Sequence, residues 1–316
     1  WPPARARHCG GGFPADRGLR RIHAKFGEPA KPLACRIYPY AFHPKGKQVV
    51  VSLRFSCPSV VRNLGHSVRS QHGELRSIAR QILPENVTAI RPPRLTDRTT
   101  LPWDDLLRVV RALHATMGDE ESPVAVKLLR ALTWLGLVEQ AKFDAISGAR
   151  LDELLELLSA AAAAEFPADF DLSSLPPAGS WGRTLFRMHA GQYARIDSYA
   201  SGLGRVAGRW RMFRSAVRLA RGAGDVPPLH ESLPGVPFDA LEQPFGPPPA
   251  EAEAILARYF DVKLSGMHFC GRAYYQAPLV EGFRSLALVY VAVMWIARWR
   301  AAAAGRPARS RQHLGE

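Results

Sequence analysis

Cysteine is the residue type in this chain whose placement most clearly indicates chemistry. The 316 residues include four cysteines, and three of them, Cys9, Cys35 and Cys57, lie within the first fifth of the chain. So few cysteines do not make a disulfide scaffold, and their clustering predicts a site instead. Thiolates are good ligands for zinc and for iron–sulfur clusters.

A predicted β-hairpin brings two of these cysteines together. Residues 37–43 and 47–56 have the composition and alternation of strands, joined at Pro44-Lys45-Gly46. Cys35 comes just before the first strand and Cys57 just after the second, each eleven residues from Gly46. Opposed residues of an antiparallel pair have Cα atoms roughly 4.5–5.5 Å apart. We therefore expect the two thiolates to share a metal; a disulfide and two unrelated buried thiols are the alternatives.

Two cysteines do not complete a metal site, because zinc and iron–sulfur clusters usually take four ligands. Cys9 is the natural third ligand, since the glycines after it let backbone approach a cluster closely. His23 and His43 are candidate nitrogen donors, although a lone histidine is more often an ordinary polar residue. Cys270 is far away in sequence, and we interpret it as a small buried hydrophobe.

Positive charge is concentrated around the same cysteines. Residues 1–66 contain twelve Lys or Arg against Asp16 and Glu28, which is +10 of the chain's net +14. A basic surround stabilises thiolates and an anionic cluster, and it also attracts phosphate or an acidic protein.

Three short motifs surround the cysteines. Residues 21–27 read Arg-Ile-His-Ala-Lys-Phe-Gly, residues 32–39 read Pro-Leu-Ala-Cys-Arg-Ile-Tyr-Pro, and residues 54–58 read Arg-Phe-Ser-Cys-Pro. With these motifs, residues 9–66 resemble the cysteine-cluster family of bacterial zinc- or iron-chelating proteins, which includes YkgJ-type proteins and the flagellin lysine N-methylase. The helical remainder resembles the extension of the methylase-like branch.

This resemblance implies metal ligation by Cys35, Cys57 and Cys9. It also implies methyl transfer from S-adenosylmethionine to a lysine of a protein substrate such as a flagellin. Family members usually open with a dense Cys-x-x-Cys-Gly-x-Cys-Cys-type cluster and have a cysteine just before the Ile-His pair, where this chain has Arg20 and Arg21. Either the missing cluster precedes Trp1 or the site is degenerate.

Past Pro58 the hydrophobic pattern is helical. It predicts helices over 103–117, 124–143, 151–165, 192–221, 249–260 and 280–304. Proline-rich stretches at 91–101 and about 222–249 indicate linkers. We therefore expect an α+β fold, with a basic cysteine-bearing hairpin subdomain over 1–66 and a mainly helical domain over 67–316.

A basic binding module is the competing function, with nucleic acid or an acidic protein as partner and a degenerate metal site. One face of the predicted helix 192–221 carries Arg211, Arg214, Arg218 and Arg221, and another carries Trp210, Phe213 and Val217. Such an arginine stripe could meet phosphates, but it is more often the solvated face over a buried apolar one. No glycine-rich nucleotide cradle and no hydrolase motif occurs in the sequence.

Targeting signals are not evident. No secretory leader pattern opens the sequence. The longest apolar run, 285–297, lies between Arg284 and Arg298 and is shorter than the roughly 20 residues of a spanning helix. We expect a cytoplasmic protein without a membrane span, in which this run is a core helix.

Overall fold

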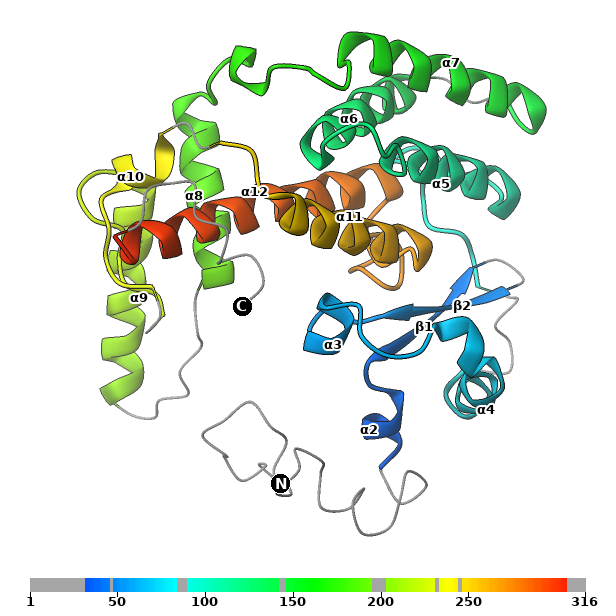
Figure 1. The fold of residues 1–316 in the computed structure, drawn as a ribbon, viewed down its shortest axis with the longest axis horizontal. Coiled ribbons are helices and arrows are strands. Elements are labelled where there is room, and N and C mark those ends of the chain that lie inside the picture. The colour runs from blue at the N-terminus through cyan, green and yellow to red at the C-terminus, as the bar shows by residue number, and fades with distance from the viewer. Residues whose placement is uncertain are drawn as a thin grey trace. The chain divides into compact units, whose positions relative to one another are not determined.

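The computed structural model describes residues 32–45, 48–83, 90–141, 146–194, 203–230, 233–243 and 246–305. The chain divides into two compact units, Trp1–Ala89 and Ile90–Glu316. The first contains a two-stranded antiparallel sheet and the second is helical, so the predicted α+β class is confirmed (Figure 1). The boundary expected after residue 66 falls inside the first unit.

The first unit is built around the predicted hairpin. Its described elements, in chain order, are α2 (Leu33–Ile37), β1 (Tyr40–Lys45), β2 (Gln48–Leu53), α3 (Pro58–Val61), the 3-10 helix η2 (Val68–Gln71) and α4 (His72–Ile82). Buried Leu75 and Ile78 lie on one side of amphipathic α4, three residues apart, as helical periodicity requires. The Tyr40 hydroxyl on β1 donates to the Gln71 side chain at 2.5 Å, which ties the sheet to the start of α4.

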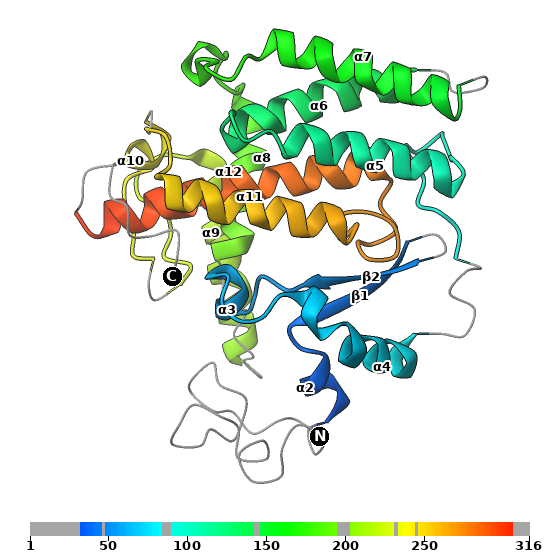
Figure 2. The same ribbon diagram turned by 45° about the vertical axis from the view of Figure 1, so that its right-hand side comes forward.

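The second unit is an assembly of helices. In chain order they are α5 (Trp103–Met117), α6 (Val124–Gln140), α7 (Ala149–Glu165), the 3-10 helix η4 (Leu172–Ser174), α8 (Ser180–Ala194), α9 (Leu203–Arg221), α10 (Phe238–Glu242), α11 (Ala250–Ser265) and α12 (Leu279–Ala303). Helices α5, α6 and α7 pack on one another, and Figure 2 shows them stacked above α11 and α12.

Helix α12 joins two hydrophobic cores. Its first half, including Phe283, packs with Trp134 of α6 and Phe260 of α11 in the larger core. Its second half, including Trp295 and Trp299, packs with residues of α8, α9 and α10 in the smaller one. By length and hydropathy α12 alone, among the described helices, could cross a membrane, but half of its apolar window is buried inside the protein. The core helix of a globular protein passes the same test of length and hydropathy, so this result is weak evidence for a membrane span.

The two proline-rich stretches are packed rather than extended. Leu95 and Leu101 are buried in the larger core, and the amides of Leu279 and Val280 donate to the carbonyls of Arg94 and Leu95. Within 222–249, the buried side chains of the smaller core are Val226, Leu233, Val236, Phe238 and Leu241. Prolines interrupt secondary structure there without preventing burial.

Candidate functional site

Cys35 lies in a single helical turn rather than at the end of a strand. The predicted first strand began at residue 37, but Ile37 is the last residue of α2 and β1 begins at Tyr40. The amide of Cys35 donates to the carbonyl of Pro32 at 2.8 Å, which sets the start of this turn. The Cys35 side chain is half-buried.

Cys57 lies between a tight turn and a short helix. Its amide donates to the carbonyl of Arg54 at 3.1 Å, so residues 54–57 form a β-turn and the Cα atoms of its ends are within about 7 Å. The carbonyl of Cys57 then accepts from the amides of Val60 and Val61 in α3. Like Cys35, Cys57 is half-buried.

The register of the hairpin differs by one residue from the predicted one. Lys45 pairs with Gln48 and Ala41 pairs with Ser52, one residue out of step with the pairing that a turn centred on Gly46 would give. Cys35 and Cys57 are therefore not a directly opposed pair, and the Cα separation expected from that pairing does not apply. The segments that flank the two strands stay paired one residue beyond β1 and β2, because the amide of Arg54 donates to the carbonyl of Pro39 at 2.8 Å.

The other predicted ligands are placed as follows. Cys9 and His23 lie outside the described residues. His43 is on β1, opposite Val50. Cys270 is buried in the larger core of the second unit with 2% of its surface exposed, as expected for a small hydrophobe. No disulfide joins Cys35 to Cys57. Within the described ranges, no group of three or more His, Cys, Asp or Glu residues is arranged to hold a metal ion.

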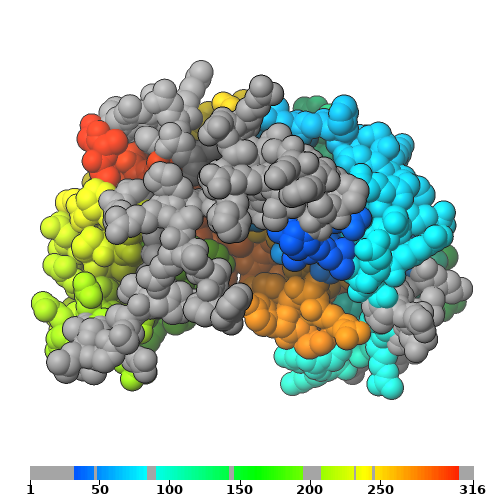
Figure 3. Space-filling model, turned by 90° about the horizontal axis from the view of Figure 1, so that it is seen from below, coloured from blue at the N-terminus to red at the C-terminus, as the bar shows by residue number. Residues whose placement is uncertain are grey.

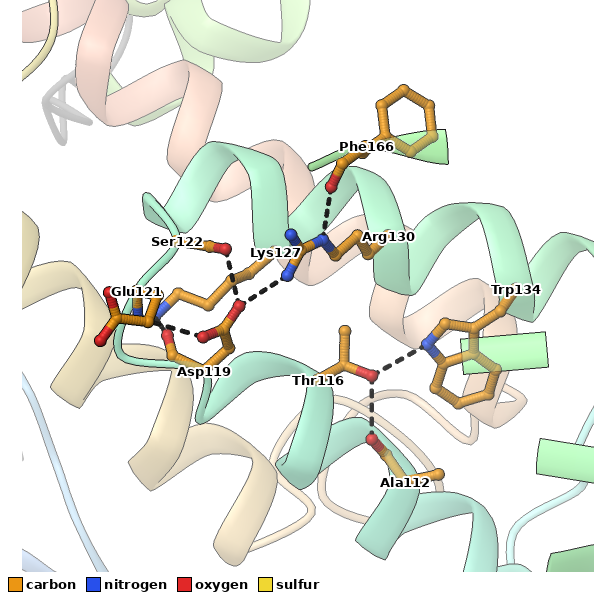
Figure 4. Close-up of polar contacts among 9 residues, drawn as sticks. All are labelled: Ala112, Thr116, Asp119, Glu121, Ser122, Lys127, Arg130, Trp134 and Phe166. Carbon is orange, nitrogen blue, oxygen red and sulfur yellow. Dashed lines mark hydrogen bonds and ion pairs between the residues drawn. The ribbon is translucent and has the colours of Figure 1, made fainter. Parts of the chain in front are cut away.

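A polar cluster that the sequence did not reveal lies at the turn between α5 and α6 (Figure 4). The carboxylate of Asp119 accepts hydrogen bonds from the Ser122 hydroxyl (2.6 Å), the Glu121 amide (3.0 Å) and the Arg130 guanidinium (2.6 Å). Lys127 donates to the Asp119 carbonyl at 2.7 Å. The three bonds to the Asp119 carboxylate lower its pKa, the Ser122 bond most, while burial lowers the pKa of Lys127.

A groove of about 560 Å³ adjoins this cluster, lined by α5, α6 and α7. Its apolar lining comes largely from small residues, among them Ala112 and Ala160, and its charged side chains include Arg108 and Asp152. Those two form an ion pair, as do Arg130 and Asp119. These four charged side chains of the groove are therefore already engaged in ion pairs that link the three helices.

The aromatic side chains in the arginine-bearing part of α9 were expected to be buried, but they are exposed. Trp210 and Phe213 are 62% and 58% exposed. The face of α9 that does pack is the one bearing Leu219, which is 5% exposed and belongs to the smaller core. The predicted arrangement of a solvated arginine face over buried Trp210 and Phe213 is therefore wrong.

Comparisons with protein-family models, with curated proteins and with solved structures found no match to this chain. Any assignment of function therefore depends on the residues described above and on the sequence motifs that surround them.

Proposed function

We propose that the N-terminal unit binds zinc or an iron–sulfur cluster through the thiolates of Cys35 and Cys57. The observation that carries the proposal is the hydrogen bond from the Arg54 amide to the Pro39 carbonyl, which keeps the two arms of the hairpin paired at its open end. Cys35 precedes Pro39 by four residues and Cys57 follows Arg54 by three, so both cysteines leave the sheet from the same end.

The local backbone limits how far each cysteine can move from that end. The turn at 54–57 folds the chain back, and α2 shortens the path from Cys35 to the strand because a helix rises only about 1.5 Å per residue. Both side chains are partly shielded from solvent. Soft thiolate donors of this kind suit zinc and iron–sulfur clusters better than magnesium or calcium.

The remaining ligands would come from residues 1–31. Cys9 and His23 supply a thiolate and an imidazole, and with Cys35 and Cys57 they complete a four-ligand set of the type that structural zinc sites use. The basic residues of 1–66 would offset the negative charge of thiolates around one metal.

Protein-lysine methylation from S-adenosylmethionine is the activity that we propose for the chain as a whole. It is supported by the resemblance of residues 9–66 to the methylase-like branch of the cysteine-cluster family. Equilibrium dialysis of the whole chain against labelled S-adenosylmethionine tests it. Saturable binding supports the proposal, and its absence in folded, metal-loaded protein contradicts it.

Single substitutions test the metal ligands. We expect Cys35→Ser and Cys57→Ser each to lower the bound iron or zinc per chain after purification without oxygen, because each removes one of a few coordinating thiolates. The matched control is Cys270→Ala, which removes a thiol from the core of the second unit and leaves the metal content unchanged. Equal metal content in all three variants would exclude Cys35 and Cys57 as ligands.

A further inference from the structure

The described part of α9 presents aromatic side chains to solvent on the side away from its packed face. Trp210, Phe213 and Val217 follow one another at helical spacing, and the first two are more than half exposed. Leu219, which packs against Gly191 of α8, marks the packed side. The lime atoms at the left of Figure 3 show that part of α9 reaches the surface of the second unit.

The two aromatic rings form one apolar block. The ring centroids of Trp210 and Phe213 are 5.6 Å apart and the ring planes are inclined by 25°, so each ring covers part of one face of the other. Two large exposed aromatic side chains in contact are costly in water, because their combined apolar surface stays hydrated. Such a block is stabilised when it is transferred to an apolar environment.

Positive charge flanks this block, and helix α9 itself supplies no acid to balance it. Arg209, Arg211 and Arg214 are all exposed. Residues 203–221 contain six arginines and no Asp or Glu. A binding surface on this face would therefore favour an anionic partner with an apolar component.

The chemistry of this face fits a lipid better than a nucleic acid. Residues 208–221 offer Ser215 as their one uncharged polar side chain, so apart from the arginines they have no groups that commonly read base edges. The stacked rings cover part of one face of each other, which reduces the aromatic surface on which a base could stack. Helices that lie in a membrane interface combine Trp and Phe on one face with Arg beside it.

We propose that α9 docks the second unit onto the surface of an anionic lipid bilayer. The Trp210–Phe213 block enters the boundary between headgroups and acyl chains, and Arg211 and Arg214 bind lipid phosphates. This contact is peripheral and does not depend on the proposed metal site in the first unit.

Co-sedimentation of the whole chain with vesicles tests this proposal. The vesicles contain phosphatidylcholine alone or phosphatidylcholine mixed with phosphatidylglycerol. We expect binding to the mixed vesicles that weakens with salt, and a loss of about fivefold in affinity for each arginine removed in Arg211→Gln/Arg214→Gln. Trp210→Ser/Phe213→Ser should reduce binding by about tenfold or more.

Trp181→Ser is the matched control, because Trp181 is 81% exposed but lies on α8. Circular dichroism verifies that every variant is folded, and the arginine pair gives a second test if the aromatic variant is not. The proposal is overturned if mixed vesicles are not bound, or if Trp181→Ser weakens binding as much as Trp210→Ser/Phe213→Ser. It is also overturned if the α9 variants reduce binding to a single-stranded oligonucleotide or to polyglutamate but leave vesicle binding unchanged.

Discussion

The guanidinium of Arg130 donates to the carboxylate of Asp119 at 2.6 Å and to the carbonyl of Phe166 at 2.7 Å. Asp119 lies in the turn between α5 and α6, and Phe166 follows the last residue of α7. One nearly buried side chain on α6 therefore joins the other two helices of this group. The Arg130 side chain is 10% exposed and that of Asp119 is 30% exposed, so water screens their interaction only in part.

We expect Asp119→Asn to destabilise the protein by about 2 kcal/mol, because it leaves the Arg130 charge buried without its partner. The control is Asp97→Asn. Asp97 pairs with Arg94, but the two side chains are 75% and 49% exposed, so this change should cost less than about 1 kcal/mol. Urea unfolding followed by circular dichroism measures both. Equal losses in the two variants would contradict a structural role for the buried pair.

The same carboxylate makes stability depend on pH. The pKa of Asp119 is lower in the folded protein than its ordinary value of 3.8, chiefly because the Ser122 hydroxyl donates to it. Its contribution is therefore complete above the unfolded pKa and is lost as the pH falls through the folded pKa. Between about pH 5 and pH 2, we expect the wild type to lose stability more steeply than Asp119→Asn. Parallel curves in urea titrations at each pH would contradict this.

Two helical glycines should respond oppositely to replacement by alanine. A Cβ at Gly282 of α12 would lie 1.8 Å from the Phe269 carbonyl oxygen, a backbone atom that cannot move aside. We expect Gly282→Ala to cost about 3 kcal/mol or more. A Cβ at Gly136 of α6 meets nothing within 4 Å, so Gly136→Ala should be neutral or stabilise by up to about 1 kcal/mol. Thermal unfolding compares them, and a stable Gly282→Ala protein would refute the close crossing.

Local signals explain which elements were predictable from the sequence. Helix α5 has the predicted bounds, Trp103–Met117, because its apolar residues keep helical spacing and acids occupy its first turn. Over 192–221 the same periodicity predicted one helix, whereas α8 ends at Ala194 and α9 begins at Leu203. Hydrophobic periodicity alone marks the ends of a helix poorly.

Long-range packing explains what was not predictable. The prolines of 222–249 indicated a linker, but the apolar residues between them fill the smaller core around Trp299. The hairpin was expected from its composition, yet its register is offset by one residue from the predicted one, and composition alone does not determine a register. The Asp119 cluster joins residues up to Phe166, and no short motif records such a separation.

The central claim is that Cys35 and Cys57 are ligands of a metal. Its most direct test is the iron, zinc and acid-labile sulfide content of the whole chain purified without oxygen, compared with that of the double variant Cys35→Ser/Cys57→Ser. We predict that the wild type retains zinc, or iron with sulfide, and that the double variant loses it while the helical unit stays folded. A folded wild-type chain that carries no metal, or a double variant that keeps the wild-type metal content, would contradict the claim.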